Sequence, residues 1–407
     1  MTITKKKLTR IFLLLTCAPA LFGATRAVSN AGVIVGCAAR YTTIQAAVNA
    51  SSLSGGDTVV VCNTGIPFNE QVTISRPLIL TGQPGATVQP NPMVQNATSL
   101  SSGNPIAAAV FVEPDITGVT ISGLIIDGSQ NQIADCVLDP IGVYFQNASG
   151  TVIHNAVRYF ELGSGLQGCQ SGIGIFAQAG AGGTANVIVE DNSVHDFQKT
   201  GIVGNEAGTT LTATSNVVTG LGPTPNIAQN GIQIGFGATG SLTGNTVSNL
   251  VYTPCVDTAN CPGSSTGLLI YDPTGSIATK SNNVSSTQGA VYYLSVIGGA
   301  ISSNVISATL VYDGIAIDTD GTNAGTGNTV NLNTIMNSSE SGVYVNTSAN
   351  PVNSNTIVET PIGIWLVNTS NPTPTGDKFF DTALTVQSGV PPAATARIRS
   401  QKVQPVR

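Results

Sequence analysis

The chain has 407 residues, of which 41% are hydrophobic and only 9% are charged. Nine of its 15 basic residues lie in residues 1–27 or 397–407, so six remain against 21 acidic residues in between, a net charge of −15. This balance excludes a nucleic-acid-binding protein, which needs a basic surface. It also disfavours a polyanionic sugar, unless cations bridge the charges.

Residues 1–27 have the three parts of a secretory signal peptide. A basic start (residues 5–10) precedes an apolar run (residues 11–15) and a stretch of small residues. Three alanines are candidate cleavage sites, and the last of them is favoured: Ala20, Ala24 and Ala27.

This leader predicts a secreted or periplasmic protein. A lipoprotein anchored through Cys17 is the less favoured alternative, because Thr16 before the cysteine fits a lipoprotein leader poorly. No later run approaches the ~18 apolar residues that span a bilayer, so the sequence predicts no membrane span.

Residues 28–55 predict an N-terminal cap. Within them, residues 41–50 carry Ile44, Ala47 and Val48 on one face of a short amphipathic helix. Such a helix would cover the end of a repeat array, which otherwise exposes its core and a sheet edge.

A repeated couplet organises the rest of the chain. Its first half is an Asn followed two residues later by Val or Ile, and its second half is a Gly that opens a short alternating apolar run. Successive Asn residues are 22 to 37 residues apart, which is the period of a solenoid. The Asn positions are 155, 192, 216, 245, 282, 304, 333 and 355, and the Gly positions are 142, 172, 201, 231, 267, 289, 314, 342 and 363.

Short alternating strands separated by Gly and Asn turns predict a parallel β-solenoid. Asn suits the recurring turn, because it tolerates a left-handed backbone and can bond to the Asn stacked on it. We predict one domain over residues 28–390, with a C-terminal cap at residues 371–390. The basic tail, residues 391–407, is predicted to be disordered.

Between about residues 41 and 367 the sequence resembles the right-handed parallel β-helix proteins of the pectin-lyase-like superfamily. The resemblance rests on the Asn and Gly repeats and on the opening stretches Thr-Ile-Gln-Ala-Ala (43–47), Gly-Asp-Thr-Val-Val (56–60) and Asn-Glu-Gln-Val-Thr-Ile (69–74). It implies an all-β, right-handed parallel β-helix of roughly ten to twelve coils. It implies no single activity, since the superfamily includes polysaccharide lyases, glycoside hydrolases, methylesterases and epimerases as well as tailspikes and adhesins.

Six cysteines follow the leader, and an even number in an exported protein predicts disulfides. The alignment of the coils narrows their pairing. One pair joins inserted loops of neighbouring coils, one lies within a single loop, and one flanks the predicted helix. In that order, the predicted disulfides are Cys136–Cys169, Cys255–Cys261 and Cys37–Cys62.

Strand alternation sorts the side chains of the Gly-headed strands. The first and third residues after each Gly are predicted to face the core, and the second and fourth to face outward. Aromatic rings with polar edges suit a sugar, so the expected partner is a polysaccharide or cell-surface glycan bound by a monomer. An ordinary solvated sheet face is the alternative. The predicted substrate-binding residues are Tyr271, Tyr293, Asp318, Tyr344 and Trp365.

Two neighbouring Asn-headed strands bring together both histidines of the chain. The alignment stacks Arg158 on His195 and His154 on Asp191, at the ~5 Å spacing of paired strands. A lyase or epimerase needs a base near the sugar carbon and a cation beside the carboxylate. A histidine could supply the base, and Arg158 or Lys199 the cation. These four stacked residues are candidate catalytic groups, and a hydrogen-bonded surface patch is the favoured alternative.

The second candidate site is an acidic stretch that lies two coils after Tyr271. Asp318 and Asp320 alternate onto one face and could lie ~6–7 Å apart, near the separation used by inverting glycosidases. Together with Asn323 they also suggest a calcium loop, although no cofactor is required. A polar strand end with its turn is the third interpretation.

The sequence therefore predicts a secreted β-helix whose surface faces carbohydrate, with a binding or structural role. A polysaccharide-active lyase, epimerase or glycoside hydrolase is the alternative.

Overall fold

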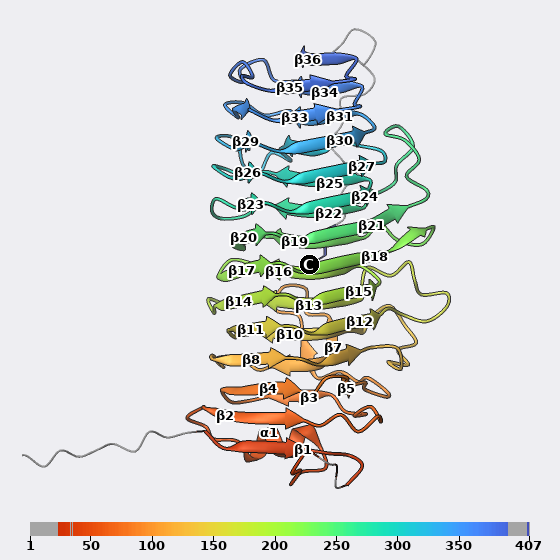
Figure 1. Cartoon of the computed structure of the whole chain (residues 1–407), viewed down its shortest axis with the longest axis vertical. Coiled ribbons are helices and arrows are strands. Elements are labelled where there is room, and N and C mark those ends of the chain that lie inside the picture. The colour runs from red at the N-terminus through yellow and green to blue at the C-terminus, as the bar shows by residue number, and fades with distance from the viewer. Residues whose placement is uncertain (1–22, 33, 35, 390–404, 407) are drawn as a thin grey trace, which may run out of the picture.

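A computed structural model describes residues 23–32, 34, 36–389 and 405–406 of the chain. In these residues the protein is a tall stack of coils with its one helix at the N-terminal end (Figure 1). Each full coil contributes one strand to each of three long sheets, which contain 12, 13 and 11 of the described strands. The predicted right-handed parallel β-helix, and its number of coils, are confirmed.

The first sheet consists of β1 (Thr25–Val28), β2 (Asp57–Val61), β4 (Leu78–Gly82), β8 (Val119–Ser122), β11 (Gly150–Ile153), β14 (Ala185–Glu190), β17 (Thr209–Thr214), β20 (Thr239–Thr243), β23 (Ala278–Lys280), β26 (Ala300–Ser302), β29 (Thr329–Asn331) and β32 (Val352–Asn353). The second sheet consists of β3 (Val72–Ile74), β7 (Pro105–Val112), β10 (Asp139–Gln146), β13 (Ile173–Gln178), β16 (Thr200–Asn205), β19 (Asn230–Gly235), β22 (Thr266–Tyr271), β25 (Gly289–Leu294), β28 (Ile315–Asp318), β31 (Ser341–Val345), β34 (Ile362–Leu366) and β36 (Leu384–Ser388), and β6 (Ala97–Thr98) pairs antiparallel with β7. The third sheet consists of β5 (Thr87–Val88), β9 (Ile125–Asp127), β12 (Ala156–Phe160), β15 (Ser193–Phe197), β18 (Val217–Thr224), β21 (Thr246–Tyr252), β24 (Asn283–Thr287), β27 (Val305–Thr309), β30 (Thr334–Ser338), β33 (Thr356–Val358) and β35 (Lys378–Phe380).

The core is a set of stacked columns, because neighbouring strands pair in register. Val157, Val194 and Val218 align on three successive strands of the third sheet and are fully buried. Each such side chain contributes roughly 1.5–3 kcal/mol by leaving water. The Gly column of the second sheet makes room for them, since a Cβ at Gly201 would lie 2.5 Å from Cγ1 of Val218.

The turn between the first and third sheets is closed by an asparagine ladder. The residue before each ladder Asn has a left-handed backbone, with φ between 51° and 67° in all eight coils. Each Asn donates its side-chain amide to Oδ1 of the next ladder residue at 2.9 to 3.1 Å, and Asp377 accepts at the end of the row. Asn245 also donates Nδ2 to the carbonyl of Ala213 and its backbone N–H to Oδ1 of Asn282. The ladder thus satisfies buried polar groups that no water reaches.

We expect Asn245→Ala to lower the free energy of unfolding by about 2–4 kcal/mol, because the buried N–H donors of Asn216 lose their acceptor. Urea unfolding measures the change. Asn186→Ala, at an exposed position of β14, is the matched control and should change stability by less than about 0.5 kcal/mol. Equal losses of unfolding free energy in the two variants would contradict a stabilising role of the asparagine ladder.

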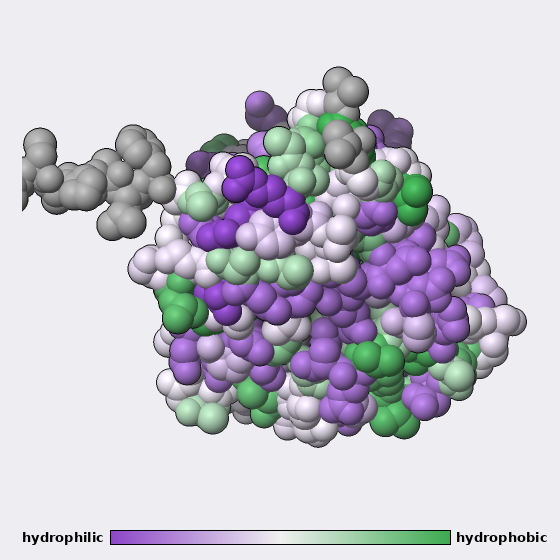
Figure 2. Space-filling model, turned by 90° about the horizontal axis from the view of Figure 1, so that it is seen from below, coloured by the Kyte–Doolittle hydropathy of each residue, from purple (hydrophilic) through white to green (hydrophobic). Residues whose placement is uncertain are grey.

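The N-terminal helix α1 (Ile44–Ala50) caps the stack where the sequence predicts it. Ile44, Ala47 and Val48 are buried against the first coils. The carboxylate of Glu70 accepts from the backbone N–H groups of Ile44 and Gln45 at 2.7 and 3.0 Å, which suits the positive end of a helix. Figure 2 shows this end from below, with mostly hydrophilic residues and small separate hydrophobic patches.

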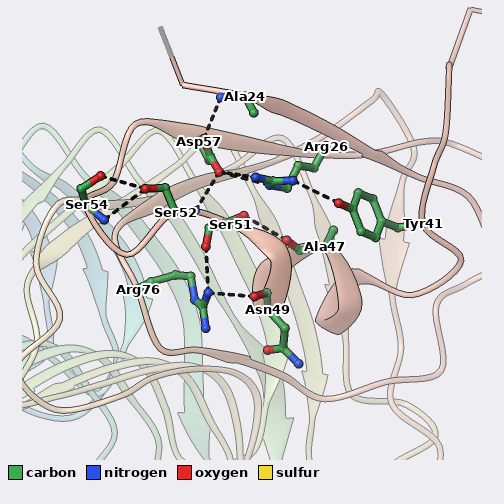
Figure 3. A network of polar contacts seen from close by, with 10 residues as sticks. All are labelled: Ala24, Arg26, Tyr41, Ala47, Asn49, Ser51, Ser52, Ser54, Asp57 and Arg76. Atoms are coloured by element: carbon green, nitrogen blue, oxygen red, sulfur yellow. Dashed lines mark hydrogen bonds and ion pairs between the residues drawn. The ribbon is translucent and has the colours of Figure 1, made fainter. Parts of the chain in front are cut away.

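The strand β1 bears on the predicted start of the mature chain. Arg26 donates from Nε and Nη2 to Oδ2 of the buried Asp57, and Ala24 donates its backbone N–H to Oδ1 (Figure 3). Burial alone would raise the pKa of Asp57, but hydrogen bonds from Ser52, Ala24 and Arg26 outweigh it and lower the pKa. Cleavage after Ala27, the favoured site, would remove Ala24, Arg26 and most of β1. Residues 1–22 lie outside the described residues.

We therefore expect the leader to be cleaved after Ala20, which keeps the whole Asp57 network. N-terminal sequencing of the exported protein checks this, and a chain beginning at Val28 would contradict it. Arg26→Ala should cost about 3 kcal/mol, because it leaves a buried carboxylate without its cation. The exposed Arg40→Ala is the control, and thermal melting of both variants compares the two losses.

All three predicted disulfides are present. At the other end of the chain, β35 and β36 continue the third and second sheets over the predicted C-terminal cap. Most of the tail predicted to be disordered lies outside the described residues, but Val406 is 5% exposed and hydrogen-bonded to the second sheet. In the part of the chain that the structure describes, no helix is long and apolar enough to cross a membrane.

Candidate functional site

The predicted sugar-binding column contains one error of register. Gly289 pairs with Thr266, so Ala290 rather than Gly289 occupies the slot of Gly267. Every later residue of β25 consequently turns to the opposite face. Tyr293 is fully buried in the core, where its hydroxyl donates to the carbonyl of Ile277 at 3.1 Å and bonds Oγ1 of Thr279 at 2.9 Å. Tyr293 therefore cannot stack on a sugar.

The outer face of the second sheet is covered rather than open. Leu294 takes the outward position, between Tyr271 and Asp318, that the prediction gave to Tyr293. Tyr292 faces outward two residues earlier and packs with Tyr344 and Trp365 in one apolar cluster. Asp318, Tyr344 and Trp365 are only 1%, 6% and 3% exposed. The indole N–H of Trp365 donates to the carbonyl of Gly389 at 3.0 Å. Of the predicted aromatic residues, Tyr271 alone is partly exposed.

The acidic stretch at the end of β28 is bound into the surrounding coils. Asp318 accepts from the Tyr292 hydroxyl at 3.3 Å and from Nδ2 of Asn346 at 2.9 Å. Asp320 accepts from the hydroxyls of Ser295 at 2.6 Å and Tyr271 at 3.3 Å. Burial raises the pKa of Asp320, but these bonds and those from Thr322 outweigh burial and lower it.

Asn323 donates its amide to Oδ1 of Asp272 at 2.7 Å, so the three predicted calcium ligands have separate protein partners. Among the described residues, no group of three or more His, Cys, Asp or Glu could hold a metal ion. Calcium binding at Asp318, Asp320 and Asn323 stays a prediction.

The other predicted cluster has the expected stacking. Arg158 on β12 pairs in register with His195 on β15. Nε of Arg158 bonds Oδ2 of Asp127 at 2.8 Å, and Nδ1 of His195 bonds Oδ2 of Asp196 at 2.6 Å. The ring of Tyr159 lies under the Arg158 guanidinium at 5.4 Å and edge-on to His195 at 6.1 Å. The predicted stacking of Arg158 on His195 is therefore present.

A backbone feature turns Tyr159 and Asp196 outward. The fourth residue after the ladder Asn has a left-handed backbone in seven of the eight coils, with φ between 52° and 60°. The residue after it, Phe160 or Phe197, turns back into the core. His154 and Asp191 lie at the other end of these strands, 3.5 Å apart and largely exposed. They form a separate surface pair.

Beside this cluster lies a polar cleft of about 490 Å³ that the sequence analysis missed. Two loops from neighbouring coils form it, one after β9 and one after β12. Four amide side chains, two serines, Tyr159 and one carboxylate are among the lining residues: Ser129, Gln130, Asn131, Gln132, Ile133, Tyr159, Glu161, Leu162, Gly163, Ser164 and Gln167.

The second loop of this cleft is firmly held. Gln198, fully buried, donates Nε2 to the carbonyls of Leu166 and Cys169, both at 2.9 Å, and accepts from the N–H of Leu162. Asn131 of the first loop donates Nδ2 to the carbonyl of Glu161 at 2.8 Å. The cleft is therefore preorganised.

Glu161 is the titratable group that the prediction overlooked. Burial raises the pKa of its carboxyl, and the negative charge of Asp196 raises it further. The sequence signal that could have identified Glu161 is its position three residues after Arg158, in the same stretch as the predicted cluster. The residues facing it, on a loop of the preceding coil, gave no such hint.

Neither proposed cation is available as a lyase would need it. The positive charge of Arg158 is paired with the carboxylate of Asp127. Burial alone would raise the pKa of Asp127, but hydrogen bonds from Ser129, Arg158 and Gln89 outweigh burial and lower it. Lys199 is fully buried, and its Nζ donates to the carbonyl of Ala228 at 2.8 Å. Burial lowers the pKa of Lys199 to about 7.

The buried amine predicts a pH-dependent stability. Between pH 7 and pH 10.5 the unfolded chain holds a proton on Lys199 that the folded chain releases, so the free energy of unfolding should rise with pH by up to about 1.4 kcal/mol per unit. In Lys199→Met this rise should vanish. Urea unfolding at pH 7, 8 and 9 measures it, with the exposed Lys280→Met as control. Parallel pH profiles for wild type and Lys199→Met would contradict the burial.

Trp365 borders a second cleft, of about 560 Å³, together with Asp257 and Glu340. A third cleft, of about 590 Å³, lies beside Phe236, Asp272 and Asn323. Neither adjoins a histidine or arginine among the described residues that line it.

Comparisons with known proteins support the fold. No protein-family model and no curated protein matches the chain. Among solved structures, a GH136 lacto-N-biosidase from Eubacterium ramulus is similar with a TM-score of 0.60 at 12% identity, over 89% of this chain and 68% of that one. XylC in complex with xylose gives 0.55 at 9% identity over 88% and 86%. A polygalacturonase from Erwinia carotovora ssp. carotovora gives 0.52 at 11% over 99% and 98%. The chain thus has the parallel β-helix of the pectin-lyase-like fold.

Proposed function

We propose that the protein binds a neutral or weakly charged polysaccharide in the polar cleft between the loops that follow β9 and β12. One observation carries the proposal: a preorganised cleft of about 490 Å³ is lined by amides, hydroxyls and Tyr159. Amides and hydroxyls match the alternating donors and acceptors of sugar hydroxyl groups. The tyrosine ring offers an apolar face with a polar edge.

The charge of the chain selects among polysaccharides. The region between residues 27 and 397 is strongly acidic, and the two candidate cations of the neighbouring cluster, Arg158 and Lys199, are paired or buried. A uronic-acid polymer would meet repulsion there. The structural neighbours include a lacto-N-biosidase and a protein in complex with xylose, which supports a carbohydrate ligand.

Hydrolysis of the bound glycan is the second candidate function. The raised pKa of Glu161 suits a general acid, and Asp196, held by His195, lies close enough to act on it electrostatically. Glycoside hydrolases use such a pair, with one carboxyl protonated and the other ionised. The predicted base His195 would then orient Asp196 instead of taking a proton from the sugar.

We expect Tyr159→Ala to weaken retention on the best-binding glycan about tenfold, because it removes the aromatic face of the cleft. A glycan array identifies that ligand, and calorimetry measures the affinity. Thr212→Ala, on the outer face of β17, is the control and should bind as wild type does. If Tyr159→Ala binds as tightly as wild type, the cleft is not the glycan site.

Glu161→Gln separates binding from hydrolysis. It keeps the shape of the cleft and removes the acid, so binding should persist while any release of reducing ends stops. Repeating both assays with a chelator tests the predicted calcium at Asp318, Asp320 and Asn323. Turnover that survives in Glu161→Gln would exclude the hydrolase assignment.

A further inference from the structure

The outer face of β16 and β19 carries an amide pair that the glycan cleft does not use. Asn205 and Gln233 are fully buried although they point away from the core of the solenoid. Nε2 of Gln233 donates to Oδ1 of Asn205 at 2.9 Å. Buried amides on an outer face require a polar partner above them.

That partner is the main chain of Val406. Its backbone N–H donates to Oε1 of Gln233 at 3.0 Å. Its carbonyl accepts from Nε2 of Gln233 at 2.7 Å and from Nδ2 of Asn205 at 2.6 Å. The primary amide of Gln233 thus pairs with the backbone of Val406 as a neighbouring strand would, using both a donor and an acceptor.

The side chain of Val406 also packs against the outer face of the second sheet. It is 5% exposed and belongs to one apolar cluster with Tyr144, Phe176 and Val203 on the same face. The hydrogen bonds select an extended main chain, and the apolar cluster selects a branched aliphatic side chain. Together these contacts make a built site rather than an incidental touch.

The chain itself has the length and the charge to fill the site. Gly389 accepts from Trp365 at one end of the second sheet, and Val406 lies six strands away, ~29 Å at the usual strand spacing. Seventeen residues can extend to ~58 Å, which is long enough to reach the site. The tail carries Arg397, Arg399, Lys402 and Arg407, opposite in charge to the acidic body.

We propose that Asn205 and Gln233 form a recognition site for an extended peptide with a branched aliphatic residue, and that the chain's own segment around Val406 is its resident ligand. In its bound position Val406 covers Asn205 and Gln233 on the outer face of the second sheet. The site is distinct from the glycan cleft, and this proposal does not depend on glycan binding there.

Hydrogen exchange on the full chain tests the contact. The Val406 N–H should exchange about 100-fold faster in Gln233→Glu, because a carboxylate cannot donate to the Val406 carbonyl. Exchange in the core strands should not change, which separates this effect from unfolding. Thr243→Ala, on the first sheet, is the control. Unaltered exchange at Val406 in Gln233→Glu would overturn the proposal.

A peptide in trans tests recognition. Val406→Asp should release the chain's own segment from the site. The substitution lies in the tail, outside the coils, so it should not unfold them. A fluorescent peptide of residues 397–407 should then bind the Val406→Asp protein saturably, as measured by anisotropy. It should bind wild type weakly, because the site is filled, and the Val406→Asp, Gln233→Glu protein not at all. Equal binding to all three proteins would reduce the interaction to charge attraction and overturn the site.

Discussion

The hydrogen-bonded turn between the first and third sheets is the constraint on which the rest of the molecule depends. A parallel coil can repeat only if its backbone turns by the same angle at the same place, and here a left-handed residue followed by a buried Asn makes that turn. Each Asn supplies the acceptor for the coil before it and needs one from the coil after it. Asp377 ends the row with a carboxylate oxygen in place of an amide oxygen, and burial raises the pKa of that carboxyl.

Because the turn between the first and third sheets is the same in each coil, the coils differ mainly in the loops that follow the strands of the third sheet. The polar cleft proposed to bind a glycan is built from two such loops on neighbouring coils. A buried glutamine recurs beneath such loops. Gln198 holds the loop after β12. Gln288 donates to the carbonyls of Tyr252, at the end of β21, and of Cys255, in the loop that follows. The frame therefore positions irregular segments as firmly as it positions strands, which a binding surface requires.

The fold follows from the sequence because its evidence is periodic. Eight Asn residues with a β-branched residue two positions later, and a Gly column that must accommodate valine methyl groups, leave few alternatives to stacked parallel coils. The site depends on events that occur once. A single shift, Ala290 in place of Gly289, moves Tyr293 from the surface to the core, and the two small residues are indistinguishable by pattern.

Coverage of a face is harder still to infer. Leu100 bonds Gln178 across 78 residues, and Val406 bonds Gln233 across 173. Such contacts have no local signature, so the aromatic residues of the second sheet were expected to be open. The Arg158 and His195 stack, by contrast, lies within the repeat and could be predicted. Glu161 lies at the edge of that stack, and its place in the cleft is visible only with the facing loop of the preceding coil.

In seven of the eight coils the fourth residue after the ladder Asn has a left-handed backbone, and this has a consequence for how the surface can change. Tyr159, Asp196, Asn249, Ser286, Ala308, Asn337 and Glu359 all occupy it, so aromatic, acidic, amide, hydroxyl and methyl groups are tolerated alike while the next residue returns to the core. The solenoid thus carries a row of display positions spaced by coils, where chemistry can be exchanged without repacking the interior. A ligand that is itself a repeating chain could be matched along this row one unit at a time.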